Sequence, residues 1–291
     1  MSVRTACLAL ALGLSGPLVS APALAQTAAD LRAGAEAGDA HAAYQYGFAL
    51  TFPLEGEPDY ASGRTWLDRA AEAGESEASY TLGLIYRDGI GVSADLNAAR
   101  SRFERAWSRG FAPAGLALAE LDLYAFAEPR PQALGILETL SQDETLGPRA
   151  RLSLAEALFF GVAGAPDAAR AVSLAQSALA ADPALGQAYY MLGVAAMEGA
   201  GRAADPAAAR ALWLRGAQAG DTLAMMALGD AHALGRGGAV DMVEAGALFG
   251  AAAALGEPGA AEAVAAINEE LTPQQRAQAQ QRQAALLNAS S

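Results

Sequence analysis

Lysine is absent from the sequence, and all 19 basic side chains are arginines. Without lysine the chain cannot form a lysine Schiff base, place a lysine in a phosphate-binding loop or act as an S-x-x-K serine acylase. Thirty-two acidic residues give a formal net charge of −13 at pH 7, and no basic run interrupts them. Such a chain is a poor candidate for binding nucleic acid or an anionic membrane surface.

Cysteine and histidine are nearly as scarce. The single cysteine, Cys7, lies near the N-terminus, and the two histidines, His41 and His232, are far apart in the sequence. We expect the histidines to be too distant to share a metal or a catalytic triad. The sequence therefore predicts no metal site, no cofactor and no enzymatic activity. A hydrolase that uses a carboxylate pair is the remaining enzymatic alternative, but no spacing marks one pair above another.

Residues 1–25 have the pattern of a cleaved signal peptide. Arg4 precedes an apolar stretch, and Ala23-Leu24-Ala25 forms an A-x-A cleavage site before Gln26. An uncleaved membrane anchor is the alternative, because residues 5–27 carry no charge and are long enough to span a bilayer. The prolines and small residues in the second half favour cleavage. We expect a periplasmic or secreted protein that has no cysteine after cleavage and does not insert into a membrane.

Glycines and alanines recur at a regular spacing through the rest of the chain. Aromatic residues make up only 7% of the sequence, and alanine supplies most of its apolar content, which favours close-packed helices. The glycines that end alanine-rich segments are separated by 36, 36, 37, 39, 34 and 36 residues: Gly38, Gly74, Gly110, Gly147, Gly186, Gly220 and Gly256. A second series has the same period: Ala42, Ala78, Ala114, Ala150, Ala188, Ala224 and Ala260. This periodicity predicts about six repeats stacked on one another.

Each repeat is predicted to contain two helices. The first starts near the repeat alanine and ends in a glycine-containing turn, and the second starts at an aspartate in four repeats: Asp59, Asp95, Asp205 and Asp241. The closing glycine is expected to adopt the left-handed conformation that ends a helix. A bulky residue of the second helix should pack against the neighbouring helix: Trp66, Phe103, Trp213 or Phe249.

The second repeat resembles a Sel-one-like repeat. The similarity rests on Ala78-Ser79-Tyr80-Thr81-Leu82-Gly83, followed by Tyr86-Arg87-Asp88-Gly89-Ile90-Gly91-Val92, Asp95 and the segment 98–110. This family is similar to the tetratricopeptide repeats, so the resemblance implies an all-α, α/α superhelical solenoid. Repeats one, two, five and six match best. Repeat three has Pro129-Arg130-Pro131 in place of the glycine turn, and repeat four carries an insertion near Asp182-Pro183, so we expect both to depart from the family pattern.

The predicted organisation is a signal peptide (1–25), a solenoid (26–271) and a C-terminal capping helix with a tail (272–291). Thr272, Pro273 and Gln275 form the sequence pattern of a capping box. A polar helix should follow and cover the open end of the stack, as solenoids require.

Three positions on the first helix of each repeat form a stripe that is a candidate for partner binding. These positions lie two, six and nine residues after the repeat alanine. The family resemblance implies that the first helices line the inner, concave surface. The predicted site consists of Tyr44, Tyr80, Arg87, Glu120, Glu156, Tyr190, Met197, Met226 and Asp230. The alternative is that the tyrosines and methionines fill space between neighbouring repeats.

These features predict a periplasmic adaptor or regulator that binds a protein or peptide. The acids Glu120, Glu156 and Asp230 would favour a basic partner segment. Some periplasmic members of the resembled family restrain membrane sensor kinases, so the resemblance implies a membrane sensor protein as one kind of partner. The alternative is an envelope protein whose tyrosines stack on peptidoglycan or another glycan.

Overall fold

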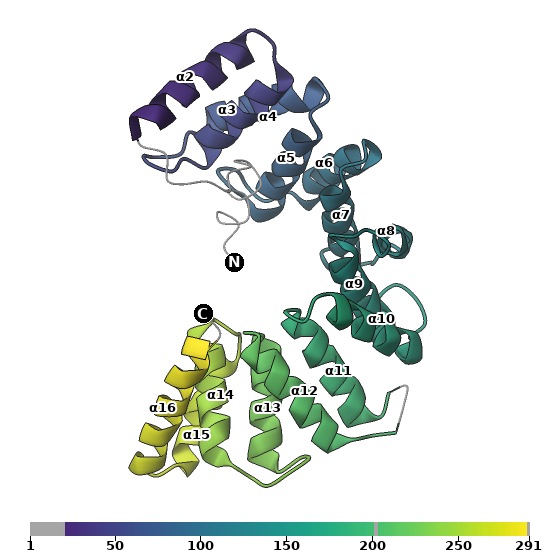
Figure 1. The fold of residues 1–291 in the computed structure, drawn as a ribbon, viewed down its shortest axis with the longest axis vertical. Helices are drawn as coiled ribbons and strands as arrows, with labels where there is room; N and C mark the ends of the chain where they lie inside the picture. The colour runs from purple at the N-terminus through teal and green to yellow at the C-terminus, as the bar shows by residue number, and fades with distance from the viewer. Residues whose placement is uncertain (1–20, 201–202, 290–291) are drawn as a thin grey trace. The chain divides into compact units, whose positions relative to one another are not determined.

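A computed structural model describes residues 21–200 and 203–289. Within these residues the chain forms fifteen helices and no strands, which confirms the predicted all-α fold. The predicted signal peptide up to residue 20, including Cys7, lies outside the described residues. The chain divides into two compact units, Met1–Ile136 and Leu137–Ser291, and the division falls inside α8 (Gln132–Leu140) (Figure 1).

The helices follow the predicted repeat. The first unit contains α2 (Ala21–Glu36), α3 (Ala40–Thr51), α4 (Tyr60–Glu72), α5 (Ser76–Asp88), α6 (Leu96–Ser108) and α7 (Ala112–Tyr124). The second unit contains α9 (Gly147–Phe160), α10 (Ala168–Ala181), α11 (Gly186–Glu198), α12 (Pro206–Gln218), α13 (Thr222–Leu234), α14 (Met242–Ala254), α15 (Ala260–Glu270) and α16 (Pro273–Ala289). The pairs α3–α4, α5–α6, α9–α10, α11–α12 and α13–α14 each pack side by side.

Within a pair, a glycine of the first helix faces a large ring of the second. A Cβ atom on Gly229 would lie 2.6 Å from Cε1 of Phe249, inside van der Waals contact. Gly83 has the same relation to Phe103, and Gly193 has it to Trp213. The three rings are buried, and the Trp213 indole N–H donates to the Tyr190 carbonyl at 3.1 Å. The prediction that these bulky residues pack against the neighbouring helix is confirmed.

Repeat one uses a different large residue at the same place. A Cβ atom on Gly47 would lie 3.0 Å from Cγ of Leu67, which is fully buried. Trp66 packs on the same neighbouring helix, as predicted, since its ring lies 5.6 Å from that of Tyr46 of α3 in an edge-on arrangement. The small residue on the first helix is thus retained, while the large residue opposite it changes.

Aspartates begin the second helices as predicted. The side chain of Asp95 accepts hydrogen bonds from the amides of Asn97 and Ala98, and equivalent N-caps are Asp59, Asp167, Asp205 and Asp241. The backbone amide of each capping residue also donates to a carbonyl near the end of the preceding first helix, as in Asp95 to Tyr86 at 2.8 Å. One residue therefore both starts the second helix and closes the turn before it.

Repeat three closes its turn in the same way with an arginine. The amide of Arg130 donates to the Asp122 carbonyl at 2.9 Å, and the Arg130 guanidinium binds the Asp122 carboxylate at 2.8 Å. Asp122 is only 1% exposed and also pairs with Arg100 of α6 at 2.8 Å. A buried carboxylate is tolerated only with such partners. The proline-containing turn departs from the repeat in sequence but keeps its backbone closure.

Most of the closing glycines are left-handed as predicted. Gly38, Gly74, Gly110, Gly220 and Gly256 have φ angles between 83° and 112°. The prediction is wrong for Gly147 and Gly186, which are the first residues of α9 and α11. The preceding α10 ends at Ala181 because Pro183 follows the extended cap Asp182, so no left-handed glycine is needed there.

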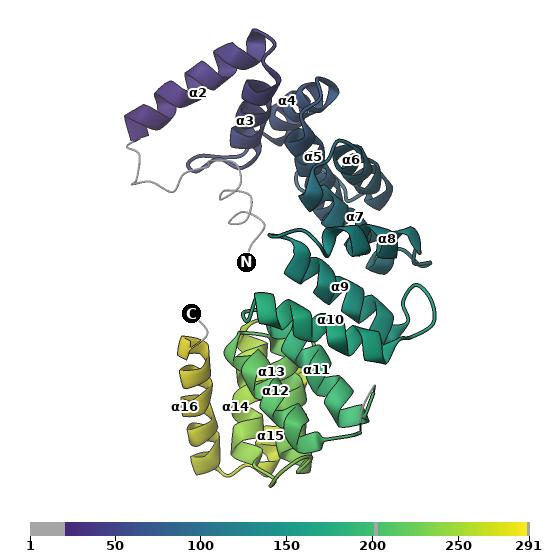
Figure 2. The ribbon, with the colours of Figure 1, turned by 45° about the vertical axis from the view of Figure 1, so that its right-hand side comes forward.

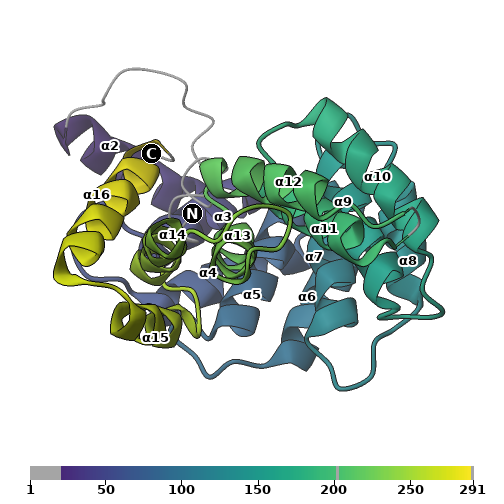
Figure 3. The same ribbon diagram turned by 90° about the horizontal axis from the view of Figure 1, so that it is seen from below.

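The C-terminal helix covers the last repeat. Thr272 and Gln275 form the predicted capping box, in which the Gln275 amide donates to Thr272 Oγ1 at 3.3 Å and the Thr272 amide donates to Gln275 Oε1 at 2.9 Å. α16 packs along α14 in each view (Figures 1, 2 and 3). Gln283 of α16 donates to the Gly250 carbonyl of α14 at 2.9 Å. The predicted cap is confirmed, and it rests on the second helix of the preceding pair.

The contact between glycine and ring makes a direct prediction about stability. Replacing Gly229 or Gly83 with alanine should lower the free energy of unfolding by about 1–3 kcal/mol, because the added methyl group overlaps a packed ring. Gly135 of α8 is the matched control, since a Cβ atom added there would have no neighbour within 4 Å and alanine favours a helix. Urea denaturation measures both effects. Equal stability of Gly229→Ala and wild type would contradict the contact.

Candidate partner-binding site

The predicted site residues are divided between the two units. The first unit contains Tyr44, Tyr80, Arg87 and Glu120; the second contains Glu156, Tyr190, Met197, Met226 and Asp230. They are all on first helices, from α3 to α13. Each unit therefore presents its own part of the predicted stripe.

Tyr80, Arg87 and Glu120 come together in the first unit. The half-buried Tyr80 ring lies 5.8 Å from Phe103 and 5.3 Å from Phe111. Arg87 donates to both carboxylate oxygens of Asp88, at 2.6 and 2.9 Å. This bond raises the pKa of Arg87, and the charges of Tyr80 and Glu120 act in the same direction. The surface here is mixed in charge, because a guanidinium lies among the acidic groups.

Tyr44 has a different environment from the other predicted tyrosines. It is only 6% exposed, and its ring meets Phe48 edge-on at a centroid distance of 6.1 Å. Tyr44 belongs to the hydrophobic core of the first unit. Tyr44 therefore fills space between packed helices, as the alternative interpretation of the tyrosines predicted.

Tyr190 lies among carboxylates in the second unit. The ring is partly buried, and this burial is the main cause of a raised Tyr190 pKa. The charges of Asp221, Glu198, Glu156 and Glu257 raise it further. These carboxylates come from α9, from α11, and from the residues just before α13 and α15. Tyr190 therefore marks an acidic surface to which three successive repeats and the start of the next contribute.

Two aspartates of the sixth repeat, Asp221 at the start of α13 and Asp230 within it, are themselves partly desolvated. Burial raises the pKa of Asp221, although a hydrogen bond from the Ala224 amide opposes the shift. Burial also raises the pKa of Asp230, opposed by the charge of Arg236. A cation brought near either group would favour its ionised form.

The two predicted methionines are partly buried. Met197 and Met226 pack against the cluster that contains Trp213, Met225 and Leu248. Because each methionine is only partly buried, it both packs against this cluster and contributes to the accessible surface.

Sequence reasoning missed three acids of the second unit: Glu198, Asp221 and Glu257. Glu198 is one residue beyond the stripe considered, at the last position of α11. Asp221 is recognisable as a helix N-cap three residues before the repeat alanine Ala224. Glu257 follows a closing glycine, and its proximity to Tyr190 depends on how α15 packs, which no local pattern shows.

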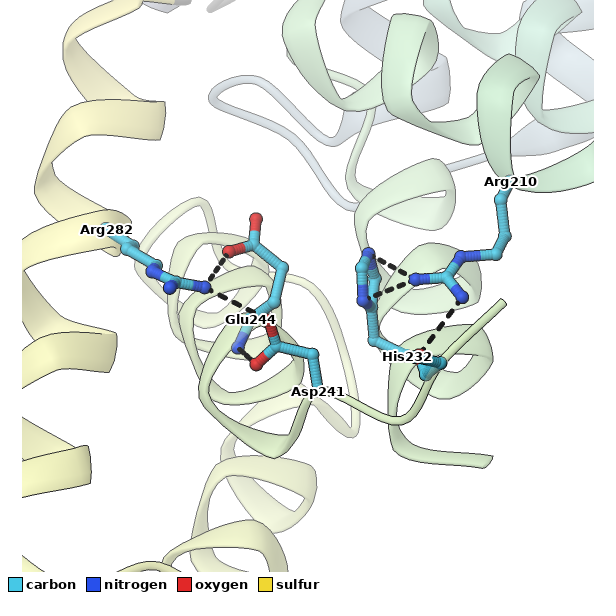
Figure 4. Close-up of polar contacts among 6 residues, drawn as sticks. Arg210, His232, Asp241, Glu244 and Arg282 are labelled. Atoms are coloured by element: carbon cyan, nitrogen blue, oxygen red, sulfur yellow. Dashed lines mark hydrogen bonds and ion pairs between the residues drawn. The ribbon is translucent and has the colours of Figure 1, made fainter. Parts of the chain in front are cut away.

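His232 belongs to a polar network in the last repeats (Figure 4). Arg210 Nη2 donates to His232 Nδ1 at 2.6 Å, which requires that Nδ1 carries no proton and that the imidazole is neutral. Burial and the charge of Arg210 lower the His232 pKa, consistent with a neutral ring. Arg282 of α16 binds Glu244 at 2.7 Å and Asp241 at 3.3 Å, which ties the capping helix to α14. This network joins helices of the last repeats to one another and to the capping helix, so we assign it a structural role.

A second titratable cluster joins repeats one and two. His41 Nδ1 lies 3.5 Å from Glu75 Oε2, and a hydrogen bond with Glu77 raises the Glu75 pKa from 4.5 to about 7. Burial and the charge of Glu77 contribute to the same shift. The sequence shows only that His41 and His232 are far apart, and no pattern in it singles out this carboxyl pair. The pair is the acid–base arrangement on which the hydrolase alternative would depend.

Two negative findings apply to the described part of the chain. No group of three or more histidine, cysteine, aspartate or glutamate side chains there is arranged to hold a metal ion. No helix in residues 21–200 and 203–289 is long and apolar enough to cross a bilayer.

A family model, the Sel1 repeat, matches the sequence at five places: residues 40–75, 76–110, 148–183, 186–221 and 222–257. These matches cover more than half of the chain and coincide with five of the helix pairs. The chain belongs to the Sel1 repeat family. Proteins with Sel1 repeats are generally non-catalytic scaffolds that bind protein partners.

Repeat four is an ordinary Sel1 repeat, which corrects the expectation that it departs from the pattern. Its insertion near Asp182-Pro183 follows the end of α10 and so leaves both helices of the pair intact. Repeat three is not among the matches, as expected from Pro129-Arg130-Pro131.

Solved structures show the same fold. Protein c5321, described as a protective antigen of uropathogenic Escherichia coli strains with an SLR fold, superimposes with a TM-score of 0.72 at 24% identity. The match covers 90% of this chain and 56% of the E. coli protein, so this Sel1 repeat chain spans little more than half of that relative. A Sel1 repeat protein from Oxalobacter formigenes matches with a TM-score of 0.65 at 24% identity, covering 97% and 82% of the two chains. No curated protein matches the sequence.

The Glu75 pKa predicts a pH dependence of stability. Unfolded Glu75 ionises near pH 4.5, whereas the folded carboxyl keeps its proton to about pH 7, so stability falls as the pH rises through this window. Glu75→Gln, which stays neutral, should raise the melting temperature at pH 8 and change it little at pH 4.5. The exposed Glu72→Gln is the control and should shift neither melt. A lower melting temperature of Glu75→Gln at pH 8 would show that the ionised carboxylate stabilises the fold.

Proposed function

We propose that this Sel1 repeat protein is a non-catalytic adaptor or regulator that binds a basic segment of a protein partner. The observation that carries the proposal is the set of four carboxylates around the partly buried Tyr190, drawn from successive repeats. A stack of repeats presents such a surface at regular intervals, which suits an extended partner. The general role of Sel1 repeats in protein binding supports the same conclusion.

The charge of the surface defines the partner chemistry. Tyrosine supplies a rigid apolar ring with a polar end, as is common in protein interfaces. The carboxylates of Glu156, Glu198 and Asp230 lie on the same row of first helices, and the whole chain carries a net charge of −13. A partner segment rich in arginine or lysine would be attracted at long range and would offset this charge on binding.

The same proposal places the protein in the bacterial periplasm. Its support is the sequence of residues 1–25, in which Arg4, an apolar stretch and Ala23-Leu24-Ala25 follow in the order of a signal peptide. In that compartment the periplasmic part of a membrane sensor protein is the partner we favour.

Export can be tested directly. The mature protein should begin at Gln26, and replacing Ala25 with arginine should block processing because the cleavage site requires small residues. N-terminal sequencing of the protein recovered from the periplasmic fraction measures this. Recovered protein that begins at Met1 would contradict cleavage.

The acidic stripe provides the test of partner binding. The triple variant Glu120→Gln, Glu156→Gln and Asp230→Asn should keep its helical signal and melting point, because partly exposed charges contribute little to stability. It should bind the partner recovered from periplasmic extract more weakly, through slower association, and its binding should depend less on salt. The kinetics can be followed by surface plasmon resonance at several salt concentrations.

A control with the same change in charge uses three exposed acids outside the first helices: Glu55→Gln, Glu57→Gln and Glu72→Gln. Binding to this control should match wild type apart from a small general charge effect. Unchanged affinity of the stripe variant at low salt would remove the proposal. Salt-independent binding of peptidoglycan fragments by wild type would instead support the glycan alternative.

A further inference from the structure

Two large apolar side chains are exposed at equivalent positions of the second unit. Phe160 ends α9 and is 55% exposed, while Leu234 ends α13 and is 59% exposed. Each is the tenth residue after its repeat alanine, Ala150 or Ala224. Single exposed apolar residues are common, but their recurrence at one position of a repeat indicates a binding surface.

Each exposed apolar residue follows an acid by one helical turn. Glu156 precedes Phe160 by four residues on α9, and Asp230 precedes Leu234 by four on α13. Residues four apart lie on the same face of a helix. On α11, between these helices in sequence, the order is reversed, with Val194 followed by the exposed Glu198.

The three helices contribute to one surface. α11 packs beside α13, and α9 and α11 share a buried hydrophobic cluster that contains Ala155 and Met191. Val240, which is 59% exposed, reaches over Gly235, since a Cβ atom on that glycine would lie 3.0 Å from Val240 Cγ2. The apolar area at Leu234 therefore extends into the following turn.

We propose that this acidic–apolar surface, defined by Glu156, Phe160, Glu198, Asp230 and Leu234, docks an amphipathic segment of the partner that alternates arginine or lysine with large apolar residues. The inference rests on the proposed function and adds the apolar half of the recognition. Charge complementarity commits it to this occupant. A purely apolar segment would take the carboxylates out of water without offering them a cation, which is costly, and a purely polar segment would leave Phe160 and Leu234 in water.

The test uses the whole mature chain and synthetic amphipathic helical peptides as probes. One peptide alternates leucine and arginine along the helical face that meets the surface, and a second has glutamate in place of every arginine. Titration calorimetry at several salt concentrations should show binding of the arginine peptide, weakened by salt, and no binding of the glutamate peptide. Circular dichroism melts confirm that each protein variant is folded.

Variants separate the two halves of the surface. Phe160→Ser with Leu234→Ser should weaken binding of the arginine peptide about tenfold or more while leaving its salt dependence unchanged. Glu156→Gln with Asp230→Asn should weaken binding and reduce its salt dependence. Leu255→Ser is the matched control, because Leu255 is 50% exposed but lies after α14, at the opposite end of its helix pair from Leu234.

Three results would overturn the inference: equal weakening by Leu255→Ser, equal binding of the glutamate peptide, or unchanged affinity of the Phe160→Ser and Leu234→Ser protein. If the acid variants alone weaken binding, this inference fails and the proposed binding of a basic segment stands. If neither pair of substitutions nor the stripe variant alters partner binding, this inference and the proposed function both fail.

Discussion

The close approach of the two helices in each pair depends on a small residue of the first helix that faces a large residue of the second. Gly83, Gly193 and Gly229 leave room for Phe103, Trp213 and Phe249, and no side chain larger than hydrogen fits those three places without displacing a ring. The remaining features of a repeat follow from this contact. Helices that lie so close can be joined by a short turn, and an aspartate at the end of that turn caps the second helix and closes the turn by its own amide.

Repeat three shows which part of this arrangement is essential. Its turn contains two prolines and is not matched by the family model, yet the Arg130 amide makes the same closing hydrogen bond to Asp122. The arginine side chain then neutralises a carboxylate that burial would otherwise penalise. The backbone closure is retained with different side chains, and the two compact units divide in the helix that follows.

Packing engages only part of each first helix, which leaves the rest of its surface open to variation. The small and apolar residues near the repeat alanine are buried in every pair, whereas the sixth and tenth residues after it differ between repeats. In the second unit these positions hold Glu156, Phe160, Val194, Glu198, Asp230 and Leu234. A regular scaffold thereby carries an irregular combination of charge and apolar side chains, which is the property that a selective binding surface requires.

The sequence by itself determined the helix pairs, their period, the aspartate caps and the C-terminal capping box, because each depends on contacts between residues close in the chain. It also placed the acids of the stripe on first helices, since helical spacing alone assigns residues to a face. Tertiary structure decided which of the predicted site residues remain accessible: Tyr44 is buried against Phe48, while Tyr190 is partly open among carboxylates. The pairing of Glu75 with Glu77 and the approach of Glu257 to Tyr190 also depend on how helices pack, and periodicity contains no information about those distances.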